Sequence, residues 1–181
     1  MQTSKDVLID LMESYKRGIH TSLEGLTPEA LIFQPDEEAN HIAVTIWHLA
    51  RIMDGLYVHR MFALNAENEL WFTQGWAEKY NYDPRGKGSN KLGMLTGYSV
   101  DEMKAVPVMS LEDMLAYFDS AHQKMIDFLN EATIEKLQEL APGSDPKRDF
   151  YFWIKITLID GTRHTGEIQA IRAMWERKQK S

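Results

Sequence analysis

Apolar residues recur at steps of three and four positions along most of this chain. Four long stretches show the pattern most clearly, and they cover about residues 3–26, 41–64, 110–130 and 148–177. Side chains at this spacing line up on one face of an α-helix, so each stretch can bury an apolar stripe against other helices. The fourth stretch opens with the run FYFWIKITLI, which is apolar enough for us to expect it deep in the core.

Residues that commonly cap helices mark where these stretches begin. Asn40 is suited to be the N-cap of the second helix, and Ser110 with Asp113 resembles a capping pair at the start of the third. Two short segments, 27–29 and 133–135, have the composition of capped single turns and follow the first and third long helices.

The segment between the second and third helices, residues 65–109, has a different composition, with five glycines and two prolines. It predicts at most two short helices, around 67–80. A long segment with little regular structure is typical of a lid or a binding loop. It is also typical of a crossover that runs the length of a bundle and is held down by aromatic residues, and the two interpretations are compatible. The aromatic residues that stand out are Trp71, Trp76, Tyr80, Tyr82 and Tyr98.

Four long helices, one long crossover between the second and third, and no convincing strand predict an all-α fold, a four-helix bundle. The length of 181 residues fits one domain, which we expect to span residues 1–181 with 65–109 as its crossover or lid. A chain of this size can bury a core without disulfides.

Charge and composition narrow the possible functions. The 27 Asp and Glu residues outnumber the 20 Lys and Arg residues, and the net charge of -7 argues against nucleic acid or an anionic membrane as a partner. No apolar run approaches the roughly 18 residues of a membrane-spanning helix, and the charged opening residues do not resemble a signal peptide, so we expect a cytoplasmic protein. The absence of cysteine excludes thiolate metal sites and a cysteine nucleophile, so any metal must bind to His, Asp or Glu.

Histidine is the first residue type to consider as a ligand, and the chain has six. His20 and His122 lie on the more polar faces of their helices, where a solvated or half-buried side chain is expected. His48 lies where the apolar face of the second helix meets its polar face, a position that suits either a hydrogen-bonded structural residue or a ligand. His41 and His59 are seven and eleven residues away, about 10 and 16 Å along a helix axis, so they cannot share a metal with His48.

The fourth helix supplies partners for His48. Asp160 and His164 are four residues apart and therefore project from one helical face, a spacing that suits two ligands of one ion, and Glu167 continues that face. The three polar residues interrupt an otherwise apolar stripe. Because a buried carboxylate without a cation is costly, something must compensate Asp160, and a metal ion, Arg51 or Arg163 would each do so.

Three segments together resemble the DinB/YfiT-like superfamily of four-helix-bundle metalloenzymes, over nearly the whole chain. They are WHLARIMD at 47–54, ELWFTQGWAEKYNYDP at 69–84 with GYS at 97–99, and DGTRHTGEIQAIR at 160–172.

The resemblance implies that one histidine of the second helix and two ligands of the fourth bind a divalent metal, commonly zinc or nickel. By position these ligands are His48, Asp160 and His164. The superfamily most often has histidine where Asp160 stands, although a carboxylate occupies this place in the branch that resembles mycothiol-dependent maleylpyruvate isomerase. Glu167 stands where glutamine is usual, and it could be a partner of a ligand, an extra ligand or a base.

The resemblance also implies a reaction. Relatives include transferases that use low-molecular-weight thiols, so the leading hypothesis is a metal-dependent transferase or isomerase with a small-molecule substrate and a thiol cosubstrate. In it, Arg51 would pair with an anionic substrate group, or simply with Asp54 or Asp160. Four aromatic residues of the crossover would bind substrate as pocket walls: Trp71, Trp76, Tyr80 and Tyr98.

Two other hypotheses remain open. One is a metal-dependent hydrolase with Glu167 as general base, and the other is a non-catalytic, stress-associated bundle with a structural metal. Ten methionines and five tryptophans exceed what a small bundle would comfortably bury, so we also expect a homodimer, as is common among the relatives.

Overall fold

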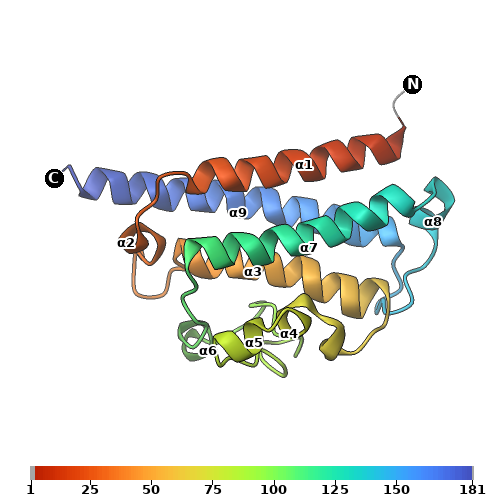
Figure 1. Cartoon of the computed structure of the whole chain (residues 1–181), viewed down its shortest axis with the longest axis horizontal. Helices are drawn as coiled ribbons and strands as arrows, with labels where there is room; N and C mark the ends of the chain where they lie inside the picture. Colours follow the sequence, from red (N-terminus) through yellow and green to blue (C-terminus); the bar gives the residue numbers. More distant parts are fainter. Residues whose placement is uncertain (1–2, 181) are drawn as a thin grey trace.

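Four long helices lie side by side in the computed structural model, which describes residues 3–180 (Figure 1). They are α1 (Ser4–Leu23), α3 (Ile42–Gly55), α7 (Leu111–Glu131) and α9 (Phe150–Lys178). Helix α7 contacts α1 and α3, and α9 also contacts α1 and α3, so the four form a closed bundle. Within residues 3–180 no strand forms, and the predicted all-α four-helix bundle is confirmed.

Helices α3 and α7 run in the same direction, which explains the long crossover. The end of α3 and the start of α7 lie at opposite ends of the bundle, so the chain must travel back along its length (Figure 1). Along this path it forms a 3-10 turn (Ala66–Asn68), α4 (Leu70–Thr73), α5 (Trp76–Lys79) and α6 (Val100–Lys104). Helix α6 was not among the predicted elements, although Ser99 and Glu102 form a capping box there.

Most predicted helix starts are confirmed, with one correction. Ser110 caps α7 by accepting a hydrogen bond from the amide of Asp113. The predicted capped turns are α2 (Pro28–Leu31) and α8 (Ile134–Gln138). The N-cap of α3 is His41 rather than Asn40, because the His41 ring accepts the hydrogen bond from the amide of Val44 at 3.1 Å.

Helix α3 is the central element of the fold. Every residue from Ile42 to Gly55 is buried, because α7, α9 and the crossover cover it on all sides. A π-helical stretch (Leu56–Met61) continues it close to its predicted end. A polar residue of α3 therefore needs a partner inside the protein, and this requirement shapes the site described below.

Helix α9 is less buried than its opening run suggests. Phe150 and Ile154 belong to the core, but Tyr151 is 42% exposed and Ile159 is 40% exposed. The expectation of a deeply buried start was therefore wrong for part of the run, because α9 has neighbours on only some of its sides. Among residues 3–180, no helix combines the length and the apolar character that crossing a membrane requires.

Candidate metal centre

His48 of α3 faces Asp160 and His164 of α9, because these two helices pack against each other. One ligand atom from each of the three side chains lies within 4.8 Å of the other two. Nε2 of His48 is 3.3 Å from Oδ2 of Asp160, and Nε2 of His164 is 3.7 Å from Oδ1. The structure thus brings together the three predicted ligands, although His48 is more than a hundred residues away from the other two in the sequence.

The backbone of the crossover determines which nitrogen of His48 carries the proton. Nδ1 of His48 lies 2.5 Å from the carbonyl oxygen of Met94. A carbonyl can only accept a hydrogen bond, so Nδ1 donates, and a neutral ring then has its lone pair on Nε2. Nε2 is the ring nitrogen nearest Asp160, so its lone pair is available to a metal ion held between the two side chains.

Glu167 plays the same part for His164. Nδ1 of His164 donates a hydrogen bond to the Glu167 carboxylate, which leaves Nε2 as the acceptor nearest Asp160. A carboxylate on the far nitrogen of a histidine is a common partner of a metal ligand, because it orients the ring and makes it more basic. Of the three roles considered for Glu167, its contact in the structure fits that of a partner.

The charges of the site shift two pKa values. The hydrogen bond to Glu167, with the charge of Asp160, raises the pKa of His164 above its ordinary value. Burial alone would raise the pKa of Asp160, but its neighbours His48, His164 and Arg163 lower it. Asp160 is therefore an anion at neutral pH.

The three side chains fit a divalent cation. Oδ2 of Asp160 is buried and has no hydrogen-bond partner. With Nδ1 protonated, Nε2 of His48 is also an acceptor, and two acceptors 3.3 Å apart are satisfied only by a cation or a proton between them. The side chains of Asp160 and His164 are 27% and 22% exposed, so the site is open to solvent. Imidazole and carboxylate together suit several transition ions.

Arg51 lies near the site without reaching its ligands. Its guanidinium is fully buried and donates to Glu69 at 2.7 Å, with Asp54 3.7 Å away. Of the pairings considered for Arg51, the one with Asp54 is therefore present, and the nearer partner is Glu69. Arg163 is exposed and acts on Asp160 through its charge.

The predicted aromatic residues hold the crossover onto the bundle. Trp71 is completely buried, where its ring packs edge-on against Trp47 and its Nε1 donates to the carbonyl of Tyr82. Without exposed surface, Trp71 cannot form the wall of a pocket as expected.

The other three predicted aromatic residues are partly buried. Trp76 packs on Tyr117, Tyr80 donates a hydrogen bond to Asp113, and Tyr98 packs beside Trp47.

The remaining histidines have structural partners. His20 is 2.8 Å from Asp119 and half-exposed, as predicted. His122 is fully buried, and its Nε2 donates to the carbonyl of Met12. The expectation of a solvated or half-buried His122 was wrong, because α1 packs over that side of α7.

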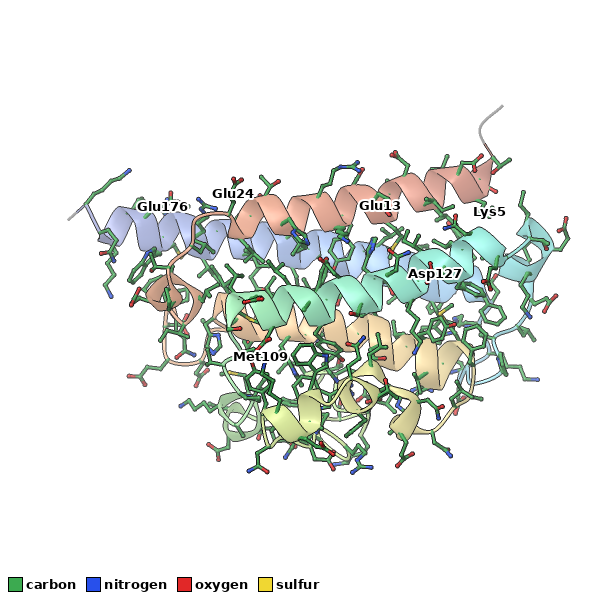
Figure 2. The ribbon with its side chains drawn as sticks, in the orientation of Figure 1. Lys5, Glu13, Glu24, Met109, Asp127 and Glu176 are labelled. Carbon is green, nitrogen blue, oxygen red and sulfur yellow. The ribbon has the colours of Figure 1, made fainter. Side chains whose placement is uncertain are left out.

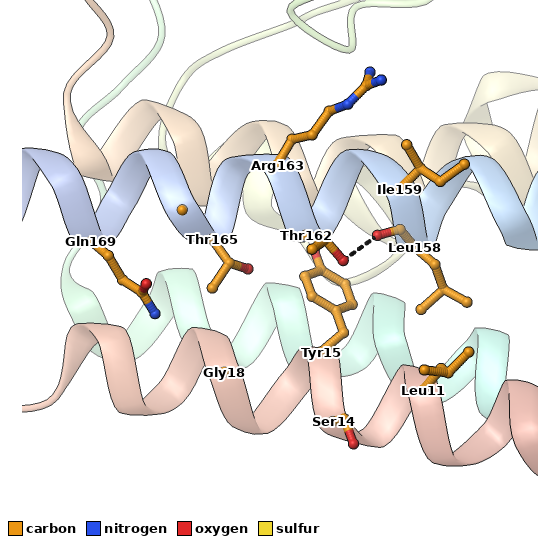
Figure 3. A pocket seen from close by; sticks show the side chains of 11 residues that line it. Leu11, Ser14, Tyr15, Gly18, Leu158, Ile159, Thr162, Arg163, Thr165 and Gln169 are labelled. Atoms are coloured by element: carbon orange, nitrogen blue, oxygen red, sulfur yellow. Dashed lines mark hydrogen bonds between the residues drawn. The ribbon is translucent and has the colours of Figure 1, made fainter.

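A groove of about 740 Å³ lies between α1 and α9 (Figure 3). Leu11, Tyr15, Ile159 and Thr162 contribute to its lining, but none of the three candidate ligands does. Arg163, which also contributes to the lining, extends away from α1 in this view. The groove is therefore separate from the three side chains of the candidate metal centre.

Two groups that shape the site were not predicted from the sequence. The carbonyl of Met94 sets the tautomer of His48, and a backbone group has no signal in the sequence. Glu69 pairs with Arg51, although one glutamate among many in a loop does not stand out. Three-dimensional contact alone identifies both.

Comparison with known proteins agrees with this fold. A solved structure described as a conserved protein from Enterococcus faecalis superposes with a TM-score of 0.75 at 17% identity, covering 95% of this chain and 96% of that one. At this identity the likeness shows the fold alone. No curated protein matches the chain. The profile of the DinB superfamily matches residues 16–168, which is most of the chain and includes all three candidate ligands. The chain therefore belongs to the DinB superfamily.

Proposed function

We propose that this protein is a metal-dependent enzyme that binds zinc or nickel through His48, Asp160 and His164. We further propose that it transfers or isomerises a small-molecule substrate with the help of a low-molecular-weight thiol. One observation carries the proposal: three acceptor atoms, one from each side chain, lie within 4.8 Å of one another. In both histidines Nδ1 donates a hydrogen bond to a neighbouring group, which leaves Nε2 free to bind a metal.

The donor set favours a catalytic role over a structural one. Three protein ligands leave a coordination position free, which is typical of catalytic sites, whereas structural zinc sites use four. A divalent ion in this position would supply Lewis-acid chemistry that lowers the pKa of a thiol or of water. The chain holds protons on Nδ1 of His48 and His164, and Asp160 supplies one negative charge. The chain has no cysteine, so a thiol must come from a substrate or cosubstrate.

The contacts of Glu167 bear on the hydrolase alternative. A hydrolase needs a general base near the attacking water, and Glu167 is the nearest carboxylate outside the ligand set along α9. Because this carboxylate already accepts a hydrogen bond from His164, it is engaged in orienting a ligand. We therefore rank thiol transfer above hydrolysis. Loss of turnover in Glu167→Gln with the metal retained would reverse that ranking.

Elemental analysis of the untagged protein tests metal binding. We expect a near-stoichiometric transition metal in the parent and its loss in the Asp160→Ala, His164→Ala variant. A matched control is His20→Ala, Asp119→Ala, which removes another half-exposed His–Asp pair, 2.8 Å apart, and should keep the metal. Equal metal content in the parent and the Asp160, His164 variant would show that the ligand assignment is wrong.

A spectroscopic titration tests the thiol. Cobalt(II) loaded into the protein gives visible bands that change when sulfur binds to it. We expect new charge-transfer bands on addition of N-acetylcysteine and none with its S-methyl analogue. If neither compound changes the spectrum, the thiol hypothesis fails, and a hydrolase or a structural metal becomes the better interpretation.

A further inference from the structure

A turn of the crossover, residues 92–94, presents three successive carbonyl groups to α3. Arg51 donates to two of them, from one guanidinium nitrogen to Leu92 at 3.2 Å and from Nε to Gly93 at 3.1 Å. His48 donates to the third, that of Met94, at 2.5 Å. His48 and Arg51 can hold the same turn because residues three apart lie on one face of a helix.

The position of Arg51 is set by groups outside this turn. Its guanidinium pairs with Glu69 at 2.7 Å, and Glu69 also accepts a hydrogen bond from His59 at 2.6 Å. The pKa of Glu69 is lowered despite its burial, by the hydrogen bond from His59 and by the charge of Arg51. A buried ion pair with these additional hydrogen bonds is well fixed, so Arg51 offers the turn a rigid pair of donors.

The shape of the turn leaves it little freedom. Gly93 has a φ of 64°, and a Cβ there would overlap the carbonyl of Pro84. The Met94 side chain lies against Gly55 of α3, where a Cβ would come within 2.5 Å of its sulfur. The Met94 carbonyl is thus placed by Arg51 on one side and by these two close contacts on the other.

We propose that Arg51 is a positioning residue of the metal centre: by holding the turn at residues 92–94, it places the Met94 carbonyl that keeps the His48 proton on Nδ1. The inference rests on the proposed metal site for its functional meaning. Without that carbonyl, the other acceptor beside His48 is Oδ2 of Asp160, 3.3 Å from Nε2. The proton would then move to Nε2, where it blocks the lone pair that a metal needs.

The proposal makes a selective prediction about the two histidines. His164 takes its tautomer from Glu167, on its own helix, and does not depend on the turn. A change at Arg51 should therefore alter His48 and leave His164 as it is. A general loss of packing would affect both rings.

Nitrogen NMR of the metal-free protein, labelled with ¹⁵N-histidine at pH 8.5, provides the test. This pH is about two units above the pKa of an unperturbed imidazole. His48→Gln identifies the His48 signals. In Arg51→Lys, which keeps the charge but loses the planar fork of donors, we expect the His48 proton to shift toward Nε2. We also expect zinc affinity to fall about 10-fold or more.

Asp54→Asn is the matched control, because Asp54 lies in the same buried cluster, 3.7 Å from Arg51, but forms its hydrogen bonds outside the turn at residues 92–94. Its carboxylate accepts hydrogen bonds from the amides of Leu70 at 2.9 Å and Trp71 at 3.0 Å. This variant should lower the melting temperature without moving the His48 proton. If it moves the proton as far as Arg51→Lys does, the effect is general destabilisation and the proposal is wrong.

Gly93→Ala disturbs the turn at its contact with Pro84 and keeps the buried ion pair of Arg51 and Glu69 intact. We expect it to shift the His48 proton as Arg51→Lys does. A His48 proton that stays on Nδ1 in both variants would overturn the proposal. Because the tautomer is read without metal, a shift in a protein that binds no zinc would support the positioning role while the proposed metal function fails.

Discussion

At the scale of single residues, a group on the far nitrogen directs each imidazole of the metal centre. A backbone carbonyl does this for His48 and a carboxylate for His164. The two differ in kind, because a carboxylate can be changed by mutation and a carbonyl can only be moved. The contribution of Glu167 is therefore directly measurable.

Removal of the Glu167 carboxylate should weaken metal binding. We expect the zinc Kd of Glu167→Ala to rise about 10- to 100-fold, because the His164 ring loses its orienting partner. Glu167→Gln should rise less, since the amide oxygen can still accept from Nδ1. Competition with a chromophoric chelator measures both, with the exposed Glu176→Ala on the same helix as a control. An unchanged Kd in Glu167→Ala would contradict the assigned role.

His122 should make stability depend on pH. Burial lowers its pKa in the folded protein, so the unfolded chain binds more protons as the pH falls below about 6.5. His122 therefore contributes to the free energy of unfolding at pH 7.5, and this contribution is lost as the pH falls. In His122→Gln, whose amide can still donate to the Met12 carbonyl, urea unfolding should lose less stability between pH 7.5 and 5.5. An equal loss in parent and variant would exclude His122 as a source.

At the scale of elements, the contact between α1 and α9 depends on a glycine. The Tyr15 ring lies against Gly161, which follows the candidate ligand Asp160, and a Cβ at Gly161 would come within 2.6 Å of that ring. The Tyr15 ring also packs edge-on against Phe118, which leaves it little room to move away from Gly161. Close approach of these helices thus needs a residue without a side chain.

Alanine at two glycines of α9 should have opposite effects. We expect Gly161→Ala to destabilise the protein by about 1–3 kcal/mol, because the core is overpacked there. Gly166→Ala, whose Cβ would meet no atom within 4 Å, should stabilise it by about 0.5–1 kcal/mol through helix propensity. Urea unfolding of the two variants makes the comparison. Equal effects would show that α1 and α9 are less tightly packed than described.

At the scale of the whole molecule, the surface combines many acidic groups with an apolar strip. Glu24, the residue after the end of α1, and Glu176 of α9 lie on the outside of the bundle (Figure 2). Between these helices, however, Leu11 and Ile159 are 48% and 40% exposed beside the groove of Figure 3. An apolar strip of this kind favours association, and the homodimer stays a prediction that mutation of this strip can test.

Light scattering coupled to size exclusion tests the dimer. We expect the parent to elute with twice the chain mass of 20.9 kDa. The Leu11→Glu, Ile159→Glu variant should be a folded monomer, since both side chains are exposed in the single chain. Val108→Glu, at another exposed apolar residue, is the control and should remain a dimer. A monomeric parent would contradict the expectation.

The sequence by itself determined what depends on neighbours along the chain. Helices follow from apolar spacing, caps such as Ser110 act within three residues, and Asp160 with His164 share a face because four residues make about one turn. Family resemblance then paired these two residues with His48.

The tertiary structure alone decided what depends on contacts between distant segments. It buried His122 under α1, paired Arg51 with Glu69 and the crossover, and placed the Met94 carbonyl on His48, 46 residues away. Spacing along a helix shows only which face a residue lies on. What covers that face follows from packing, so the three side chains of the candidate site could be predicted and the groups that direct their rings could not.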